Sequence, residues 1–164
     1  MSETYVECLI KKEASTIAKF CRLVLFMTTG VFVVIGFVFP LLLFVALLTG
    51  VCAYLVNLNT DLEYEYLYLD KELTIDVIKA KTKRKRVARI EVERLEILAP
   101  INSYHLDSYK NRTTKTVDYS IGYAAQPDKR YVMFYDGNQK IIISPSEELV
   151  KAIRNIAPRK VFMD

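Results

Sequence analysis

The chain has 164 residues, 23 of them basic and 19 acidic, and a formal net charge of +4. Such a mild excess does not by itself indicate a nucleic-acid-binding protein. Its three cysteines, Cys8, Cys21 and Cys52, lack the paired spacing of a zinc site or a disulfide framework, so the sequence predicts neither.

The N-terminal segment, residues 4–10, is rich in strand-forming side chains and is expected to be extended. It could pair with a later part of the chain or lie at a membrane interface, and both readings stay open. A helix is expected to begin near Glu13. Residues 1–19 are therefore interpreted as a cytoplasmic lead-in to the apolar segment that follows.

The most distinctive feature is a stretch from Leu23 to Thr60 without a single Asp, Glu, Lys, Arg or His. As one helix it would reach about 57 Å, against a hydrocarbon core of about 30 Å. Gly36 and Pro40 supply a break near its middle, because Gly is permissive at a turn and Pro lacks an N–H. The sequence therefore predicts a transmembrane helical hairpin over residues 20–58, with spans at about 20–39 and 41–58.

Basic residues flank this hairpin, whereas its turn carries no charge. The lead-in contributes Lys11, Lys12, Lys19 and Arg22, and further basic residues follow the second span. By the positive-inside rule, the protein is expected to be a multi-pass protein of the plasma (cell) membrane with both termini cytoplasmic. Without ionisable groups between Leu23 and Thr60, the hairpin is interpreted as an anchor rather than an ion pathway.

Small residues at matched depths predict how the hairpin packs. Gly30 and Gly50 each lie ten residues from Pro40, and Ala46 precedes Gly50 by about one helical turn. Small side chains let two helices approach closely in lipid. We therefore predict that Gly30, Ala46 and Gly50 mediate transmembrane helix packing, either within the hairpin or between copies of the chain.

Residues 61–164 form the expected cytoplasmic domain, and its first part shows strand periodicity. Tyr64, Tyr66 and Tyr68 alternate on one face, and the residues 73, 75 and 77 repeat this pattern after a turn. Continued alternation would send several lysines into the core, so the chain is expected to reverse at a basic hairpin tip near 81–85. Short strands are expected at 87–90 and 95–98.

The second part is expected to hold an irregular segment, a hairpin and a final helix. Residues 101–128 are the least regular, with a helical turn near 105–110 and a strand near 117–122. Asp136-Gly137-Asn138 between two apolar runs indicates a hairpin. Ser144-Pro145-Ser146-Glu147 fits a capping box before an amphipathic helix that ends ahead of Pro158. Strands followed by a helix indicate an α+β membrane protein.

These features together resemble the PH-like domains of small, uncharacterised bacterial membrane proteins with an N-terminal transmembrane hairpin. Residues 66–75 look like the opening strand, turn and strand of such domains, and residues 144–162 look like their last strand, helix and tail. The resemblance covers nearly the whole chain and implies a partly open, twisted barrel capped by a helix. It carries no catalytic residue to transfer, and PH-like folds host lipid, peptide and protein binding alike.

No motif for chemistry stands out. The chain has no Gly-rich phosphate loop, no H-E-x-x-H and no G-x-S-x-G, and His105 is its only histidine. We therefore expect no enzymatic activity, no catalytic residues, no cofactor and no metal. A third hypothesis, an unrecognised enzyme that uses Tyr and Ser groups of residues 101–128, is set behind the binding readings.

The basic run between residues 79 and 89 is the one feature above background. It could be a solvated hairpin tip, or it could contact the anionic headgroups of the inner leaflet, each base near the surface contributing about 1 kcal/mol. Nucleic acid is disfavoured, because the neighbours of the run are acidic rather than aromatic. The candidate lipid-contact residues are Lys81, Lys83, Arg84, Lys85 and Arg86.

The sequence thus predicts a non-enzymatic, membrane-anchored PH-like module that presents a protein- or lipid-binding surface at the cytoplasmic face. Its expected partners are the lipid bilayer, anionic lipid headgroups and a protein that the sequence does not name. The alternative is a structural subunit that docks a larger membrane complex through the face of its hairpin that holds Gly30 and Gly50.

Overall fold

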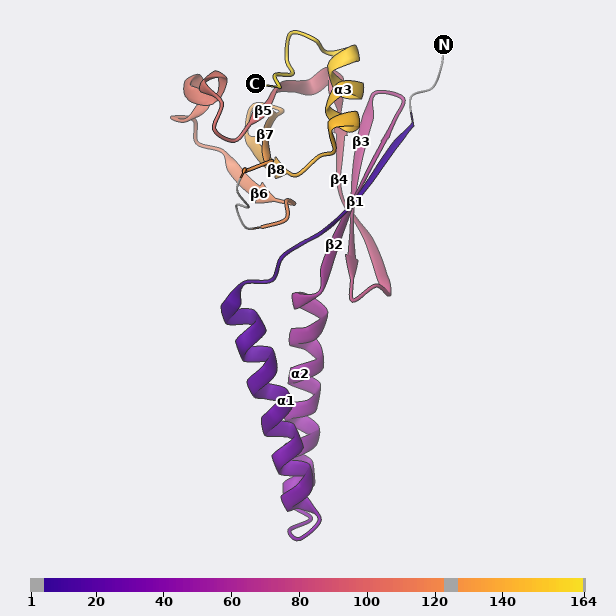
Figure 1. Ribbon diagram of the computed structural model, residues 1–164, viewed down its shortest axis with the longest axis vertical. Coiled ribbons are helices and arrows are strands. Elements are labelled where there is room, and N and C mark those ends of the chain that lie inside the picture. The colour runs from indigo at the N-terminus through magenta and orange to yellow at the C-terminus, as the bar shows by residue number, and fades with distance from the viewer. Residues whose placement is uncertain (1–4, 123–126, 164) are drawn as a thin grey trace.

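The computed structural model describes residues 5–122 and 127–163. Parts of the expected lead-in and of the irregular segment 101–128 therefore lie outside the described residues. A long helical hairpin projects from one end of a domain built of two β-sheets and one C-terminal helix (Figure 1). The mixed α+β architecture predicted from the sequence is confirmed.

The hairpin consists of α1 (Thr16–Gly36) and α2 (Leu42–Thr60), joined by a turn over 37–41. Ser15 caps α1, its hydroxyl accepting the N–H of Ala18 over 3.2 Å, so the helix begins slightly later than predicted. Both helices are long and apolar enough to cross a membrane, and few of their residues are buried inside the protein. The predicted break near Pro40 is confirmed.

Four antiparallel strands follow one another across the first sheet: β1 (Val6–Lys11), β2 (Leu62–Leu69), β3 (Glu72–Lys79) and β4 (Lys83–Glu91). β1 precedes the hairpin in sequence but pairs with β2, so that Val6 lies opposite Tyr68. The N-terminal segment therefore belongs to the domain, whose expected beginning at residue 61 leaves this strand out. The chain leaves the sheet after β1, passes down and up the hairpin, and re-enters beside its own first strand.

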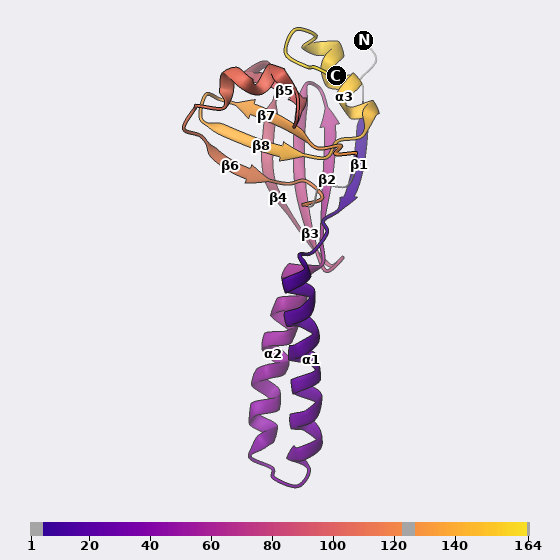
Figure 2. The ribbon, with the colours of Figure 1, turned by 60° about the vertical axis from the view of Figure 1, so that its left-hand side comes forward.

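The second sheet has the order β5-β7-β8-β6, and it lies across the first (Figure 2). Its strands are β5 (Leu95–Pro100), β6 (Lys115–Asp118), β7 (Tyr131–Tyr135) and β8 (Gln139–Ile143). Two 3₁₀ helices, η1 (Val92–Arg94) and η2 (Tyr104–Tyr109), flank β5. The hairpin predicted at 136–138 joins β7 to β8, and the strand expected at 117–122 is β6, which begins earlier and pairs in parallel with β8.

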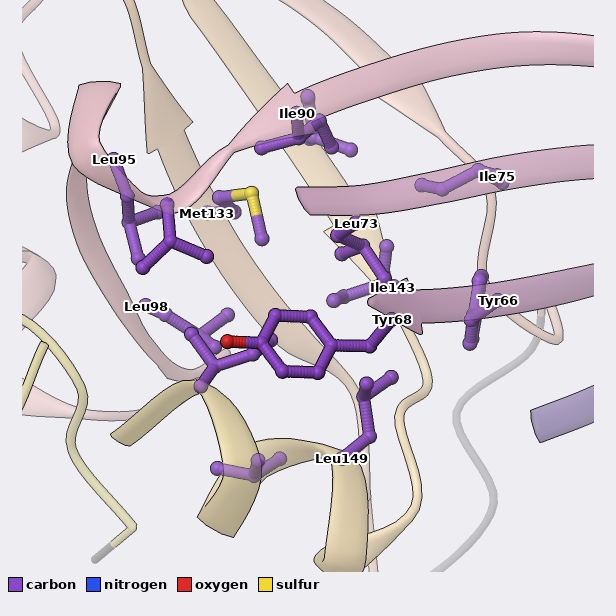
Figure 3. Packing of buried hydrophobic residues seen from close by; sticks show 14 of the residues in the cluster. Tyr66, Tyr68, Leu73, Ile75, Ile90, Leu95, Leu98, Met133, Ile143 and Leu149 are labelled. Carbon is purple, nitrogen blue, oxygen red and sulfur yellow. The ribbon is translucent and has the colours of Figure 1, made fainter. Parts of the chain in front are cut away.

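The core lies between the sheets, and α3 (Glu147–Ile156) covers one end of it. Tyr66 and Tyr68 are almost fully buried there, so the predicted alternation on β2 is confirmed. Figure 3 shows Tyr68 among Leu98 and Leu149, two of the side chains of this cluster.

The predicted start of α3 is wrong by two residues. Ser146, not Ser144, is the N-cap, and its hydroxyl accepts the N–H of Leu149 over 3.3 Å. Pro145 therefore precedes the cap rather than opening the helix. The Ser144 hydroxyl instead accepts the N–H of Ile121, which ties the segment before α3 to the chain after β6.

Candidate functional site at the junction of hairpin and domain

The hairpin joins the domain through two short connections. Residues 12–15 link β1 to α1, and Asp61 alone links α2 to β2. Backbone hydrogen bonds hold both: the N–H of Lys12 donates to Leu62 over 2.9 Å, and the N–H of Glu13 donates to Ile121 over 2.7 Å. The hairpin is therefore fixed against the domain rather than attached by a free linker.

A cavity of about 440 Å³ lies at this junction. Both connections and the first turns of α1 contribute to its walls. Its lining consists of Lys11, Lys12, Glu13, Ala14, Lys19, Arg22, Thr60 and Asp61. We call it the junction cavity. Four of these residues are basic and two are acidic, so the lining has a net positive charge.

Three of the four basic residues of the junction cavity have defined contacts with other side chains. Lys11 pairs with Asp61, Nζ to Oδ1 at 3.1 Å, and so neutralises one of the two acids. The Lys12 ammonium lies 5.7 Å from the centroid of the Tyr64 ring. Arg22 donates from Nη1 to the amide oxygen of Asn57 over 3.2 Å. Within residues 5–122 and 127–163, Lys12, Lys19 and Arg22 form no ion pair with a carboxylate.

The reversal predicted in the basic run lies nearer its start than expected. The turn between β3 and β4 occupies residues 80–82, and it faces the hairpin end of the domain (Figure 1). The N–H of Ala80 donates to the carbonyl of Asp61 over 2.8 Å. Lys81 lies in this turn, whereas the other predicted lipid contacts, residues 83–86, belong to strand β4.

Arg84 and Arg86 are not free cations at a hairpin tip, and this part of the prediction is corrected. Arg84 donates from Nε to Asp76 over 2.7 Å and pairs with Glu65 through its Nη2, while Arg86 lies 3.5 Å from the other Asp76 oxygen. Both carboxylates are buried on the outer face of the first sheet. They neutralise the two arginines, which leaves Lys81, Lys83 and Lys85 as the exposed lysines of the run.

The pKa values of two members of this ionic cluster are shifted. Burial raises the pKa of the Glu65 carboxyl above its usual value, and the Arg84 guanidinium opposes that rise. The hydrogen bond to Asp76 is the main cause that raises the pKa of Arg84. The cluster thus has the character of a structural ion pair network across β2, β3 and β4.

Two of the three predicted packing residues lie between the helices, and one does not. Ala46 is almost fully buried, and a Cβ added to Gly50 would lie 3.5 Å from Thr29. Gly30 faces outward, because an added Cβ there would meet no described atom within 4 Å. The equal spacing of the two glycines from Pro40 predicted that they lie at the same depth, but it said nothing about which side of each helix they occupy.

Sequence reasoning missed the close packing of the hairpin at Gly36. A Cβ on Gly36 would lie 2.5 Å from Cδ2 of Leu43. Sequence reasoning also missed Ala53, which is fully buried on α2. The spacing of Ala53 from Ala46 was the available signal, because residues seven apart share one face of a helix.

The family comparison covers nearly the whole chain. A family model described as Bacterial PH-like domain (DUF6106) matches residues 2–163. The chain belongs to this family. No curated protein and no solved structure matches it. This match confirms the resemblance to bacterial PH-like domains that residues 66–75 and 144–162 indicated.

The match to the bacterial PH-like domain family includes the hairpin as well as the two sheets. In this PH-like protein the junction cavity gathers ammonium and guanidinium groups, which can bind an anion. Phosphate and carboxylate are the anionic groups that such donors hold best.

Proposed function

We propose that the protein is a non-enzymatic, membrane-anchored PH-like module that presents a protein- or lipid-binding surface at the cytoplasmic face of the plasma membrane. The apolar side chains that α1 and α2 expose along their length support the anchor. The basic residues at one end of the hairpin, and their absence from its turn, support cytoplasmic termini.

The observation that carries the proposal is the gathering of bases where the hairpin meets the domain. The junction cavity lies there, and so do Lys81 and Lys83 beside the β3–β4 turn. A base near an anionic leaflet contributes about 1 kcal/mol of attraction. Because the anchor already holds the domain at the surface, such weak contacts are enough to orient it.

The lipid-binding reading now rests on a smaller set than the sequence suggested. Lys81 and Lys83 carry it at the turn, whereas Arg84 and Arg86 are held by Asp76. Lys85 lies on the same strand, further from the turn. The outer face of the first sheet, with Leu9 and Leu69 exposed, is the surface left for a protein partner.

Two measurements on the full-length protein test the proposal. A C-terminal reporter fusion that is active only in the cytoplasm should be active, and an external C-terminus would overturn the proposed topology. In phosphatidylcholine nanodiscs, added phosphatidylglycerol should slow hydrogen exchange at the β3–β4 turn.

The Lys81→Ala/Lys83→Ala variant should lose this protection. A matched variant, Lys110→Ala/Lys151→Ala, removes two exposed lysines elsewhere in the domain and should keep it. If added phosphatidylglycerol does not change hydrogen exchange in the wild type, the turn does not contact lipid, and protein binding is the function that remains.

A structural subunit that docks a larger membrane complex through its hairpin is the second candidate. The observation that favours it is the open face at Gly30, where a partner helix could approach closely. Ala46 and Gly50 are already used within the hairpin. Gly30→Leu should then abolish co-purification of a partner in mild detergent while leaving the protein in the membrane.

A further inference from the structure

The junction cavity contains more positive charge than its own acids balance. Lys11 occupies Asp61, which leaves Glu13 as the remaining acid beside three cations. These cations, Lys12, Lys19 and Arg22, line one cavity and have no carboxylate partner among the described residues. Like charges around a shared cavity repel one another unless an anion lies between them.

Two different elements hold these three groups. Lys12 follows β1, and its stem is packed close to Gly122 while its ammonium lies over Tyr64. Lys19 and Arg22 are three residues apart on α1, so they share a face and differ in height by about 4.5 Å. The Asn57 amide fixes the position of the Arg22 guanidinium. The fold therefore positions Lys12 and Arg22, and Lys19 is exposed on α1 one turn before Arg22.

The height of the cavity on the hairpin indicates which anion would reach it. Arg22 is the last charged residue of α1, and the uncharged stretch begins at Leu23. Leu23 and Phe26, four residues after Lys19 and Arg22 and so on the same side of α1, are exposed apolar side chains. An anion in the cavity would thus have an apolar surface beside it, which suits a headgroup whose acyl chains continue along α1.

We propose that the junction cavity binds the phosphate of an anionic phospholipid, with Lys12, Lys19 and Arg22 as its donors. This inference rests on the proposed function, because it needs the hairpin in the membrane with the junction at the inner leaflet. A free phosphate ion offers the same oxygens, but it would leave the apolar surface at Leu23 and Phe26 uncovered.

Native mass spectrometry of the full-length protein, released from nanodiscs of mixed phosphatidylcholine and phosphatidylglycerol, tests the proposal. The wild type should retain phosphatidylglycerol in preference to phosphatidylcholine. Lys12→Ala/Lys19→Ala should lower the apparent affinity for phosphatidylglycerol by about tenfold or more, because each lysine near the surface is worth about fivefold. The control Lys110→Ala/Lys151→Ala removes the same charge elsewhere and should retain the lipid.

Further arms separate the outcomes. Lys12→Arg/Lys19→Arg should restore retention, and equal retention of both lipids by the wild type would overturn the inference even if the alanine variant fails to fold. Inorganic phosphate that competes fully with the lipid would overturn the choice of a phospholipid. The reporter fusion is measured in parallel. If the C-terminus is cytoplasmic but the protein shows no lipid preference, only this inference is overturned. If the C-terminus is external, the proposed function is overturned.

Discussion

The hydroxyl of Tyr66 accepts the backbone N–H of Ser144 over 3.1 Å, although the two residues are 78 positions apart in sequence. The same hydroxyl donates to the carbonyl of Tyr119 over 2.6 Å. One buried phenol thus connects β2 of the first sheet to the chain that follows β6 and β8 of the second. Burial raises the pKa of this phenol well above its usual range, so it stays protonated and able to donate.

Tyr66→Phe should destabilise the domain although it removes a single oxygen. The N–H of Ser144 and the carbonyl of Tyr119 would both lose this partner, and a buried polar group without a partner costs about 1–3 kcal/mol. Thermal unfolding of the full-length protein in detergent should show a clear fall in Tm. An unchanged Tm would mean that this hydroxyl does not hold the sheets together.

Tyr68→Phe is the matched change and should have the opposite sign or no effect. Tyr68 is buried on the same face of β2, but its hydroxyl has no hydrogen-bond partner among the described residues. Removing that oxygen relieves a buried polar group without creating another. The same thermal measurement should give a Tm equal to or above that of the wild type, and a large fall would contradict the structure at this position.

The ion pair network on the outer face predicts a pH-dependent variant. Arg84→Leu leaves the Glu65 and Asp76 carboxylates without their shared cation. Asp76 keeps Arg86, so the main cost falls on Glu65, which is buried and loses its cation. A buried polar group without a partner costs about 1–3 kcal/mol, and a charged one costs more. Arg89→Leu, whose partner Glu72 is more exposed, should cost less.

The sign of the pH effect follows from Glu65. Its pKa is raised in the folded protein above the usual 4.5, so the folded state binds this proton more tightly than the unfolded state does. Stability from this group is present below pH 4.5 and is lost as the pH rises through the raised pKa. Losing Arg84 raises that pKa further, so the deficit of Arg84→Leu should be largest at neutral pH and shrink toward pH 4. A pH-independent deficit in denaturant titrations would contradict this.

Local patterns in the sequence predicted much of this fold, and contacts distant in sequence account for most of the differences. Alternation placed Tyr66 and Tyr68 in the core because a strand has one buried face. Alternation could not place Arg84, because its carboxylate partners lie on β2 and β3. The charged start of β4 was therefore interpreted as part of a hairpin tip. The pairing of β6 with β8 and the junction cavity likewise depend on how distant segments meet. Lys12, Lys19 and Arg22 were visible only as flanking charge that indicated topology.

The glycines of the hairpin should respond differently to the same substitution. A Cβ on Gly36 would lie 2.5 Å from Cδ2 and 2.9 Å from Cγ of Leu43, so Gly36→Ala forces the helices apart beside the turn. Gly30→Ala meets no described atom within 4 Å and should be neutral, or slightly stabilising through helix propensity. Titration with SDS in mixed micelles should show a lower unfolding midpoint for Gly36→Ala alone, and equal midpoints would contradict the packing described.

Asn57 should stabilise the packing of α1 against α2 beside the junction cavity, because its amide oxygen accepts a hydrogen bond from Nη1 of Arg22 on the other helix. Asn57→Leu removes the acceptor while keeping an apolar side chain of similar size. Hydrogen bonds between transmembrane helices are worth about 0.6 kcal/mol on average and up to about 1.7. The SDS titration should therefore show a small loss for Asn57→Leu and none for Asn57→Asp, whose carboxylate also accepts from Arg22. If both variants unfold with the wild type, the Arg22 guanidinium is not held by this contact, and the cavity above it would lose one positioned donor.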